Sequence, residues 1–364
     1  MDGTALVFCE GAFGQPGGKT ANGLARFGTR YEILGVVDSA HAGRDAGELV
    51  AGVTRRIPVF SSVHQAVEGL GRRPDYLVVG LNPPDNRFPP AFRRVVRDAL
   101  RMGVNVDSAL RPYLHEDAEF PGLAQQASVR IRSVGYPKPL AQLRAYTGEI
   151  EGITTPKVAV VGTHAVVGKR TTTVRLANAL QARGVRSEMI GTGTTSWFQG
   201  VRSTIILDSI LTGYVAGELE GAILGAHAAY QPEVFVLEGQ GSVLNPANPS
   251  GLELLTTARP DAIVMQHALV HSSLPADDPF GAETLDRHIR AAELLSGSPV
   301  VAITLNPENA GADANARAVE HFHKRFGLLV TDVLDEGTDS LVDVVCKQLG
   351  LAPRREDAKT RGGD

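Results

Sequence analysis

The residues best suited to chemistry lie in a glycine-bounded run, GTHAVVGKRTTT, which extends from Gly162 to Thr173. The run follows the apolar segment 157–161 and precedes a stretch with helical spacing of apolar residues. In a strand, loop and helix of this kind, backbone N–H groups and the positive end of the helix face one spot, which suits a polyphosphate. Lys169 can reach the terminal phosphates of such a ligand. The run therefore predicts a phosphate-binding loop for ATP, and an incidental Gly-rich turn is the competing interpretation.

The predicted cofactor site comprises this loop and the first turn of the helix that follows it. Its residues are Gly162, Thr163, His164, Ala165, Val166, Val167, Gly168, Lys169, Arg170, Thr171 and Thr172. Five residues separate Gly162 from Gly168, where the common pattern has four, and Arg170 occupies the place of the usual Ser or Thr. This leaves Thr171 or Thr172 as the hydroxyl ligand of Mg²⁺. His164 either alters which substrate group is recognised or merely fills the loop.

Two acidic residues follow apolar runs elsewhere in the second half of the chain. Glu238 ends the apolar segment 233–238 and precedes Gly239, and Asp208 follows the run TIIL. A carboxylate at the carboxyl end of a strand can hold Mg²⁺ beside phosphates, directly or through water. We therefore expect Thr171, Asp208 and Glu238 to bind the metal and Lys169, Asp208 and Glu238 to be catalytic. The alternative for Glu238 is an exposed acid at an ordinary strand end.

Two more residues of the second half are candidates for substrate binding. Gln199 follows the chain's single Trp in a Gly- and Thr-rich stretch that we expect to be a substrate loop, with a surface loop as the alternative. Glu218 lies with Glu220 on a segment with helical spacing, where a solvated helix face accounts for at least one of the two acids.

The first half carries a second GKT triplet, from Gly18 to Thr20, again after an apolar segment. It is a poor phosphate loop, because Phe13 stands where the spacing requires Gly and Pro16 stiffens the loop. We expect Lys19 and Thr20 to begin a helix that holds a substrate carboxylate or phosphate. A capping turn without a ligand is the alternative.

Three further features invite a function and have simpler explanations. Asp38 ends the segment 31–38, where a dinucleotide-binding domain places its ribose-binding acid, but the required G-x-G-x-x-G is missing, so we expect Asp38 to cap a turn. His267 and His271 have the i, i+4 spacing of one helical face, yet no third ligand accompanies them, which argues against zinc and leaves His267 as a hypothetical general base. Residues 272–285 are expected to form a lid.

Alternation of short β-branched runs with longer amphipathic stretches predicts the elements that position these residues. The fold class is α/β, with two doubly wound, mainly parallel-sheet domains at 1–150 and 151–351 and a disordered tail at 352–364. The expected strands lie at 5–11, 31–38, 75–82, 103–110, 157–163, 186–194, 233–239, 261–266, 299–306 and 327–334. The clearest helices follow Lys19 and span 63–70, 92–103 and 171–184.

The composition narrows the classes of partner. The formal charge of -4 gives no basic field to attract nucleic acid, and no apolar run approaches the roughly 20 residues that span a bilayer. The two cysteines have no metal-ligand spacing. We expect a cytoplasmic protein that binds a small amino-acid or carboxylate substrate and contacts neither nucleic acid nor membrane.

Several spaced motifs resemble known families. The loop spacing is similar to that of dethiobiotin synthetase and cobyrinic acid amidating enzymes, and the GTHAVVGKRTTT, TGTTSWFQG, LDSILTGYVAGELE and VLEGQGSVLNP runs, in that order, resemble the DUF1611 family. That resemblance implies a Rossmann-like N-terminal domain, a P-loop NTPase-like C-terminal domain and a homo-oligomer. It also implies a link to D-glutamate N-acetyltransferases, which form one branch of the family.

Three functions remain open from the sequence. The leading hypothesis is an enzyme that uses ATP and Mg²⁺ to activate a small carboxylate and form an N-acyl or amide product. The second is an N-acetyltransferase for D-glutamate or another D-amino acid, in which the same loop holds the phosphates of acetyl-CoA. The third is a regulatory or assembly protein that uses the loop as a nucleotide switch.

Overall fold

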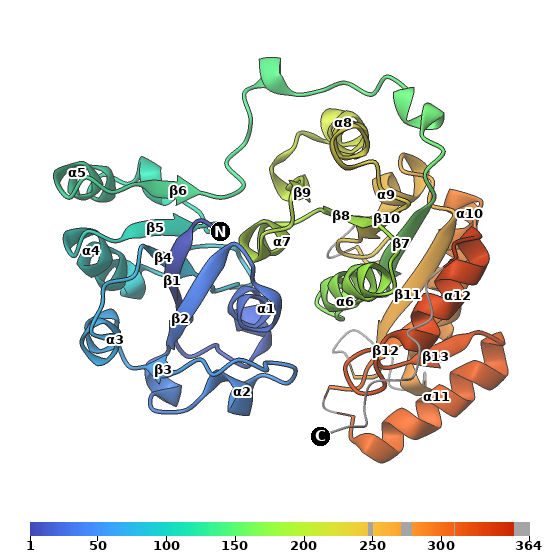
Figure 1. Cartoon of the computed structure of the whole chain (residues 1–364), viewed down its shortest axis with the longest axis horizontal. Coiled ribbons are helices and arrows are strands. Elements are labelled where there is room, and N and C mark those ends of the chain that lie inside the picture. The colour runs from blue at the N-terminus through green and yellow to red at the C-terminus, as the bar shows by residue number, and fades with distance from the viewer. Residues whose placement is uncertain (247–249, 271–278, 309, 353–364) are drawn as a thin grey trace, which may run out of the picture. The chain divides into compact units, whose positions relative to one another are not determined.

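The computed structural model of the chain describes residues 1–246, 250–270, 279–308 and 310–352. These residues divide into two compact units (Figure 1). Unit 1 comprises Met1–Pro139 and Gly193–Val201, and unit 2 comprises Leu140–Thr192 and the residues from Arg202 onward. Each is built on a parallel sheet, which confirms the predicted α/β class. The predicted boundary near residue 150 falls inside unit 2, and the predicted tail beyond Ala352 lies outside the described residues.

Unit 1, whose residues are all described, contains a six-stranded sheet in the order β3-β2-β1-β4-β5-β6. The strands are β1 (Gly3–Phe8), β2 (Tyr31–Val37), β3 (Val59–Phe60), β4 (Tyr76–Val79), β5 (Asn105–Ser108) and β6 (Ile131–Ser133). The α-helices are α1 (Lys19–Phe27), α2 (Ala46–Leu49), α3 (Val63–Leu70), α4 (Arg93–Arg101), α5 (Phe120–Gln126) and α7 (Thr194–Gln199). Figure 1 shows α3, α4 and α5 along one face of the sheet. This strand order is that of a doubly wound dinucleotide-binding fold.

Helix α7 belongs to unit 1 although its sequence interrupts that of unit 2. Its Thr195 hydroxyl lies 2.6 Å from the hydroxyl of Thr20, and the Gln199 amide donates to the Gly23 carbonyl at 2.8 Å. The Arg30 guanidinium lies over the Trp197 ring, 3.8 Å from its centroid. These contacts with α1 and the start of β2 explain why the chain leaves unit 2 after Thr192 and returns at Arg202.

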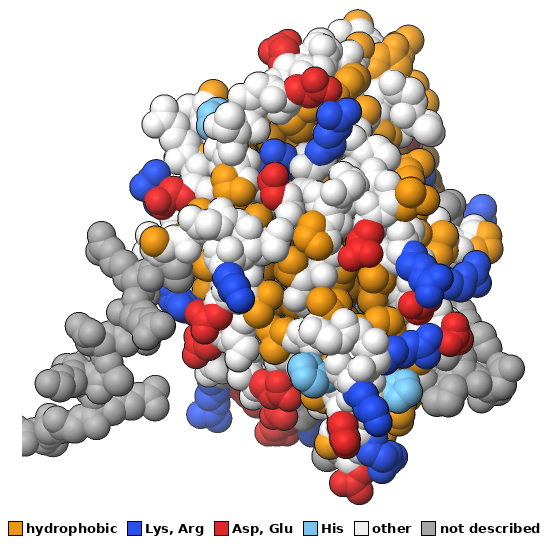
Figure 2. All heavy atoms as spheres, turned by 90° about the vertical axis from the view of Figure 1, so that its right-hand side faces the viewer, with side chains coloured by type: hydrophobic (Ala, Val, Ile, Leu, Met, Phe, Trp, Pro, Cys, Tyr) orange, Lys and Arg blue, Asp and Glu red, His pale blue; other side chains and the backbone are white. Residues whose placement is uncertain are grey.

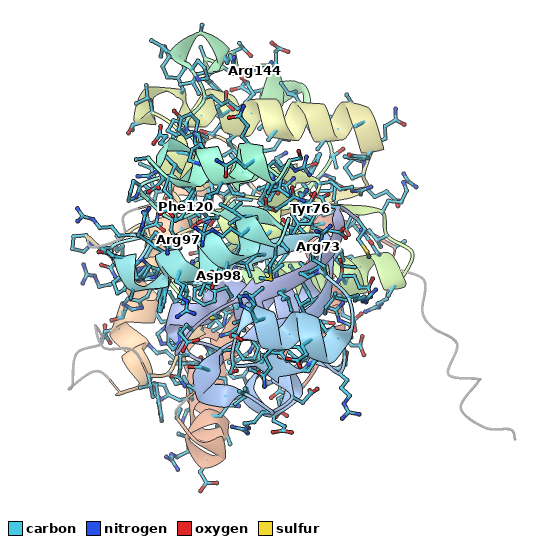
Figure 3. All side chains as sticks on the ribbon, turned by 90° about the vertical axis from the view of Figure 1, so that its left-hand side faces the viewer. Arg73, Tyr76, Arg97, Asp98, Phe120 and Arg144 are labelled. Atoms are coloured by element: carbon cyan, nitrogen blue, oxygen red, sulfur yellow. The ribbon has the colours of Figure 1, made fainter. Side chains whose placement is uncertain are left out.

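Charged side chains connect α4 to the start of α5 in unit 1, a region in which Arg97 and Phe120 are labelled (Figure 3). Arg97 and Arg93 both bond to Glu119, and the Arg93 guanidinium lies 4.4 Å from the centroid of the Phe120 ring. Hydrogen bonds from Arg93 lower the pKa of Asp117 to about 2. Because these pairs face solvent, we expect them to add little to the stability of the fold.

Unit 2 contains a seven-stranded sheet among its described residues, in the order β13-β12-β11-β7-β10-β8-β9. The strands are β7 (Lys157–Gly162), β8 (Ser187–Gly191), β9 (Ser203–Thr204), β10 (Val234–Glu238), β11 (Ala262–Ala268), β12 (Val300–Asn306) and β13 (Leu329–Thr331). The α-helices are α6 (Lys169–Ala182), α8 (Val215–Tyr230), α9 (Leu252–Thr256), α10 (Ala282–Ser296), α11 (Ala312–Phe326) and α12 (Asp339–Leu349). Helices α6 and α12 contact each other, and α9 contacts both α8 and α10.

The central strand β7 is buried along its whole length, as expected for a parallel strand covered on both faces. It pairs with β10 on one side, where Glu238 is opposite Val160, and with β11 on the other, where Gln266 is opposite Gly162. Because the strands are parallel, Glu238 and Gln266 reach the same edge of the sheet as the loop that follows Gly162. Ligands of open α/β sheets bind at this carboxyl edge.

The structure corrects several local predictions. Strand β8 ends at Gly191, before the predicted strand end at residue 194, whereas helix α6 begins at Lys169, as expected for the first turn after the loop. The strands β3, β6 and β9 have two or three residues each, and α2, α5 and α9 have at most seven. Elements of this length contain too few residues for a period of 2 or 3.6 to be recognised.

Glu218 and Glu220 do not form a solvated helix face, contrary to the prediction. Both are buried, and both accept hydrogen bonds from the segment that precedes β7: Arg144 N donates to Glu218 at 2.9 Å, and Thr147 N donates to Glu220 at 2.8 Å. Burial works to raise the pKa of Glu220, but hydrogen bonds from Thr147 and Ile150 outweigh it and lower that pKa. The two acids therefore fasten the connecting segment to α8.

Gly217 allows this segment to lie directly against α8. A Cβ atom at Gly217 would come within 2.1 Å of the Arg144 carbonyl oxygen, whereas one at Gly225, on the same helix, would meet no atom within 4 Å. We expect Gly217→Ala to destabilise the protein by about 1–3 kcal/mol through overpacking, and Gly225→Ala to stabilise it by about 0.4–1 kcal/mol. Thermal melting of both variants tests this prediction. Similar shifts in melting temperature for the two variants would show that the segment around Arg144 does not pack against Gly217.

Charged side chains of both signs are interspersed on the face of unit 2 that carries α11 and α12 (Figure 2). This agrees with the near balance of 36 Lys and Arg against 40 Asp and Glu in the whole chain. Among the described residues, the helices are all too short or too polar to traverse a bilayer.

Candidate phosphate-binding site

The loop between β7 and α6 has the geometry of a phosphate cradle. Gly168, just before the helix, has φ +110°, a conformation that favours glycine, and Val166 has φ +62°. A β-branched residue in the left-handed region is strained by about 1–3 kcal/mol, and such strain gathers at functional sites. Val166 is 52% exposed, so the tip of the loop faces solvent while Thr163 and His164 are buried.

Lys169 lies inside the loop with only 6% of its surface exposed. Its Nζ donates to the carbonyl of His164 at 2.6 Å and to the carbonyl of Gly241 at 2.9 Å. The first carbonyl belongs to the loop and the second to the turn after β10. The ammonium therefore lies between the two segments that a phosphate at the start of α6 would contact.

Arg170 forms an ion pair with Glu238. Its Nε lies 3.1 Å from Glu238 Oε1, and the carboxylate is almost completely buried. The other carboxylate oxygen accepts a hydrogen bond from Thr192 N at 3.1 Å, while the Thr192 hydroxyl donates to the Glu238 carbonyl at 2.7 Å. Glu238 is thus a buried and anchored acid, and the exposed strand end considered from the sequence is wrong.

Gln266 supports the loop from β11, a role that no pattern in the sequence indicates. Its Oε1 accepts hydrogen bonds from the hydroxyls of Thr172 and Thr304, and its backbone carbonyl accepts from Thr163 N at 3.1 Å. The Thr172 hydroxyl is therefore used to join α6 to the sheet. Thr171, the other candidate for the metal, is half-buried on the same helix.

His267 lies on strand β11, so the predicted helical face shared with His271 is wrong for His267, and His271 lies outside the described residues. The His267 Nδ1 is 2.9 Å from the Thr163 hydroxyl, and its Nε2 is 2.7 Å from the Phe280 carbonyl oxygen. Since a carbonyl only accepts, Nε2 carries the proton and Nδ1 accepts from Thr163. His267 thus connects the loop to the residues before α10. Residues 272–278 of the predicted lid lie outside the described residues, and the rest of it forms the turn Pro279–Gly281 and the start of α10.

A second histidine, His288 on α10, was missed from the sequence because it lies in an ordinary amphipathic helix. Its Nδ1 donates to the Thr284 carbonyl at 2.7 Å, so its Nε2 accepts from the hydroxyl of Ser242, also at 2.7 Å. Burial lowers the pKa of His288 below its usual value against the opposing effect of the hydrogen bond to Thr284, and the positive charges of Arg287 and Lys169 lower it further, so the imidazole is neutral at neutral pH. Ser242 directly follows Gly241, so the pair adjoins the loop.

Comparison with known proteins agrees with this architecture. Residues 144–342 match the P-loop domain of unknown function DUF1611_C, and residues 39–137 match the Rossmann-like domain DUF1611_N. The chain belongs to the DUF1611 family. This confirms the resemblance to the DUF1611 family stated from the sequence, with its Rossmann-like N-terminal domain and its P-loop C-terminal domain.

Curated relatives of this DUF1611 chain carry one name. A protein of Pseudoalteromonas named D-glutamate N-acetyltransferase is 26% identical over 69% of this chain and 75% of its own length. A protein of the same name from Tritonibacter scottomollicae is 25% identical over 74% of this chain and 80% of its own length. A DUF1611 crystal structure from Anabaena variabilis is 27% identical, with a TM-score of 0.83 over 95% of this chain and 99% of that one.

The remaining predicted residues of this DUF1611 chain lie in the turn after β9 or in unit 1. Asp208 is exposed in the short turn Leu207–Ser209, and among the described residues no group of three His, Cys, Asp or Glu side chains could hold a metal. The role of Asp208 as a metal ligand and catalytic residue beside Glu238 stays a prediction.

In unit 1 the polar groups of the GKT triplet and of Asp38 are used internally. Thr20 N donates to the Asn82 side chain at 2.8 Å, so the start of α1 is capped by protein. Asp38 accepts from Ala40 N at 3.1 Å, which confirms its predicted capping role, and also from Gly11 N at 2.9 Å. Gln199 lies on α7 rather than in a loop. Substrate binding by Lys19, Thr20 or Gln199 remains a prediction.

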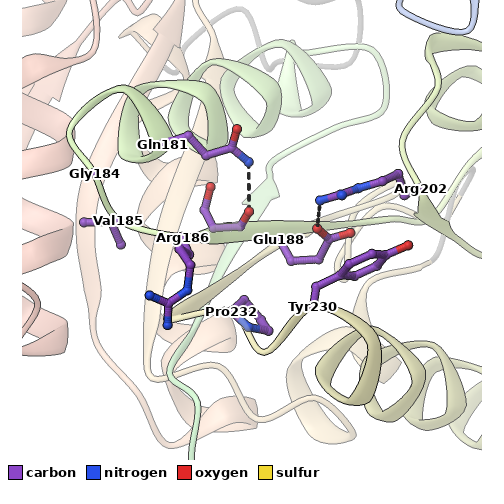
Figure 4. Close-up of a pocket in the computed structure, with 9 residues that line it drawn as sticks. Gln181, Gly184, Val185, Arg186, Glu188, Arg202, Tyr230 and Pro232 are labelled. Carbon is purple, nitrogen blue, oxygen red and sulfur yellow. Dashed lines mark hydrogen bonds and ion pairs between the residues drawn. The ribbon is translucent and has the colours of Figure 1, made fainter. Parts of the chain in front are cut away.

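A pocket of about 370 Å³ opens at the other end of the unit 2 sheet (Figure 4). It is lined by Gln181, Gly184, Val185, Arg186, Ser187, Glu188, Arg202, Tyr230 and Pro232. These residues lie at the amino ends of β8, β9 and β10, whereas α/β folds bind ligands at the carboxyl ends. Arg202 is already paired with Glu188 and lies 4.2 Å from the centroid of the Tyr230 ring. We therefore assign the chemistry to the loop and not to this pocket.

Proposed function

We propose that this protein transfers an acetyl group from acetyl-CoA to the amine of D-glutamate, and that the loop of unit 2 holds the phosphates of the coenzyme. The observation that carries the proposal is the buried Lys169 at the start of α6, inside a loop whose backbone suits phosphate. The shared name of the two curated relatives supports the acetyl group and the acceptor, and acetyl-CoA as its donor is part of the proposal.

The reaction needs a group that accepts a proton. The substrate ammonium must lose a proton before its nitrogen attacks the thioester carbonyl, after which the C–S bond breaks and the thiolate takes up a proton. The Ser242 and His288 pair supplies a neutral base beside the loop. Ser242 takes the proton from the amine as its own proton passes to His288 Nε2, so no covalent enzyme intermediate is required.

ATP-dependent ligation is the second candidate, and the same loop favours it because such loops commonly hold nucleoside triphosphates. The two functions differ in what they consume. Acetyl transfer releases coenzyme A thiol and leaves ATP untouched, whereas ligation from acetate releases ADP.

The test incubates the full chain with acetyl-CoA and D-glutamate, with L-glutamate in parallel, and with ATP, Mg²⁺, acetate and D-glutamate in a separate reaction. We expect free thiol and N-acetylglutamate in equal amounts in the first reaction and no ADP in the last. ADP formed together with the amide would replace this proposal with ligation. Ligand binding without any turnover would favour the regulatory switch instead.

A further inference from the structure

The divalent ion of a P-loop is usually held by the hydroxyl that directly follows the loop lysine, with a carboxylate from a neighbouring strand nearby. In this chain the residues at these two positions, Arg170 and Glu238, do not suit a divalent ion. Arg170 stands in place of the hydroxyl, and its guanidinium lies 3.1 Å from the carboxylate of Glu238. A metal ion bound to that carboxylate would face a like charge at short range.

Neighbouring hydroxyls do not restore the usual arrangement. Thr172 donates to Gln266, and Thr173 donates to the Lys169 carbonyl at 2.8 Å. Thr171 is one residue further along α6, which turns its side chain about 100° around the helix axis from position 170. The arginine substitution therefore changes the chemistry of the site and does not merely shift the hydroxyl by one residue.

The Arg170 and Glu238 pair is firmly held. Glu238 is 1% exposed and is fixed through Thr192, so its charge needs a permanent partner. The ion pair uses the Nε of Arg170. In the part of the chain that the structure describes, its two Nη nitrogens have no hydrogen-bond partner, and a guanidinium fork of this kind matches phosphate oxygens.

We propose that Arg170, held by Glu238, takes the place of the divalent ion, so that the loop binds the phosphates of its ligand without a metal. Lys169 and Arg170 then supply two adjacent positive charges at the start of α6. This inference rests on the proposed function for its ligand, because a coenzyme A diphosphate is bound and released intact. No phosphoryl group is transferred, so no ion is needed to stabilise a leaving phosphate.

The experiment measures the binding of coenzyme A to the full chain by titration calorimetry, once with Mg²⁺ and once with EDTA. We expect the two dissociation constants of the wild type to agree within about twofold, or less than 0.5 kcal/mol by the affinity relation. A wild type that loses affinity by roughly tenfold or more in EDTA would overturn the inference, because the ion pair would then open to admit an ion.

Arg170→Thr restores the usual hydroxyl and is the sharpest variant. In EDTA we expect it to bind coenzyme A roughly 10- to 100-fold more weakly than the wild type, because charge-assisted hydrogen bonds are lost, and to regain affinity when Mg²⁺ is added. Wild-type affinity in EDTA would contradict the proposal. Arg186→Thr is the matched control, since Arg186 is exposed at the amino end of β8 and should bind as the wild type does.

Arg170→Lys is the control for a folding defect. It keeps a positive charge opposite Glu238 and replaces the guanidinium fork, with its two Nη nitrogens, by a single ammonium. We expect it to remain independent of Mg²⁺, with an affinity between those of the wild type and Arg170→Thr. Mg²⁺-dependent binding by this variant would contradict the role of the charge. The outcomes for the proposed function are distinct from these. If coenzyme A binds equally well with and without EDTA but no acetyl group is transferred, the proposed function is wrong and the metal-free binding stands. If acetyl transfer occurs but stops in EDTA, the proposed function stands and the metal-free binding is wrong.

Discussion

Replacing Lys169 by Ala should nearly abolish the binding of coenzyme A and, with it, acetyl transfer. The ammonium is buried between the loop and the turn after β10, where phosphate oxygens can replace the carbonyls of His164 and Gly241 as its acceptors. Loss of charge-assisted bonds to phosphate should cost about 3 kcal/mol or more, which corresponds to roughly a hundredfold weaker binding. Titration calorimetry with coenzyme A measures this directly.

Lys347→Ala is the control for the loss of a positive charge, since Lys347 is exposed on α12 of the same unit. It should bind coenzyme A as the wild type does. Thermal melting of both variants separates lost binding from lost folding. If a folded Lys169→Ala protein binds coenzyme A with wild-type affinity, Lys169 does not contact the ligand, and the loop has only a structural role.

Replacing His288 by Gln should lower kcat by roughly 10²- to 10⁴-fold, the usual contribution of a general base. Gln can keep a hydrogen bond to Ser242 but cannot accept its proton. The affinity for coenzyme A should stay close to that of the wild type, because the hydrogen bonds of His288 go to Ser242 and Thr284. His323→Gln, an exposed position on α11, is the matched control and should leave kcat unchanged.

The pH dependence follows from the direction of the His288 pKa. Burial holds this pKa below 6.5, so the imidazole stays neutral, and the wild-type rate should be independent of its protonation above that pH. Because the folded pKa is lowered, its contribution to stability is present above about pH 6.5 and is lost as the pH falls through the folded value. An acid limb of kcat that persists unchanged in His288→Gln would contradict the role of this base.

Much of the fold could be predicted because its long elements carry clear patterns. The apolar run before Gly162, the helix after it and the strand that ends at Glu238 each have enough residues to show their period. Parallel strands then bring Glu238 to the edge where the loop lies. Two of the four motifs that predicted the family, GTHAVVGKRTTT and VLEGQGSVLNP, begin at the ends of these strands.

The contacts that decide the chemistry could not be predicted in this way. Arg170 was recognised as a departure from the loop pattern, but its ion pair with Glu238 depends on the packing of α6 against β10. The Ser242 and His288 pair joins residues 46 positions apart through tertiary structure alone. At least one of Glu218 and Glu220 was expected in solvent because their spacing fits a helix face, and only the connecting segment that covers α8 explains the burial of both.

The most direct test of the central claim is a crystal structure of the full chain with coenzyme A. The account predicts that phosphate oxygens of the coenzyme accept hydrogen bonds from backbone N–H groups between His164 and Lys169 and from the side chains of Lys169 and Arg170. A coenzyme bound elsewhere, with Lys169 still on the carbonyls of His164 and Gly241, would contradict it.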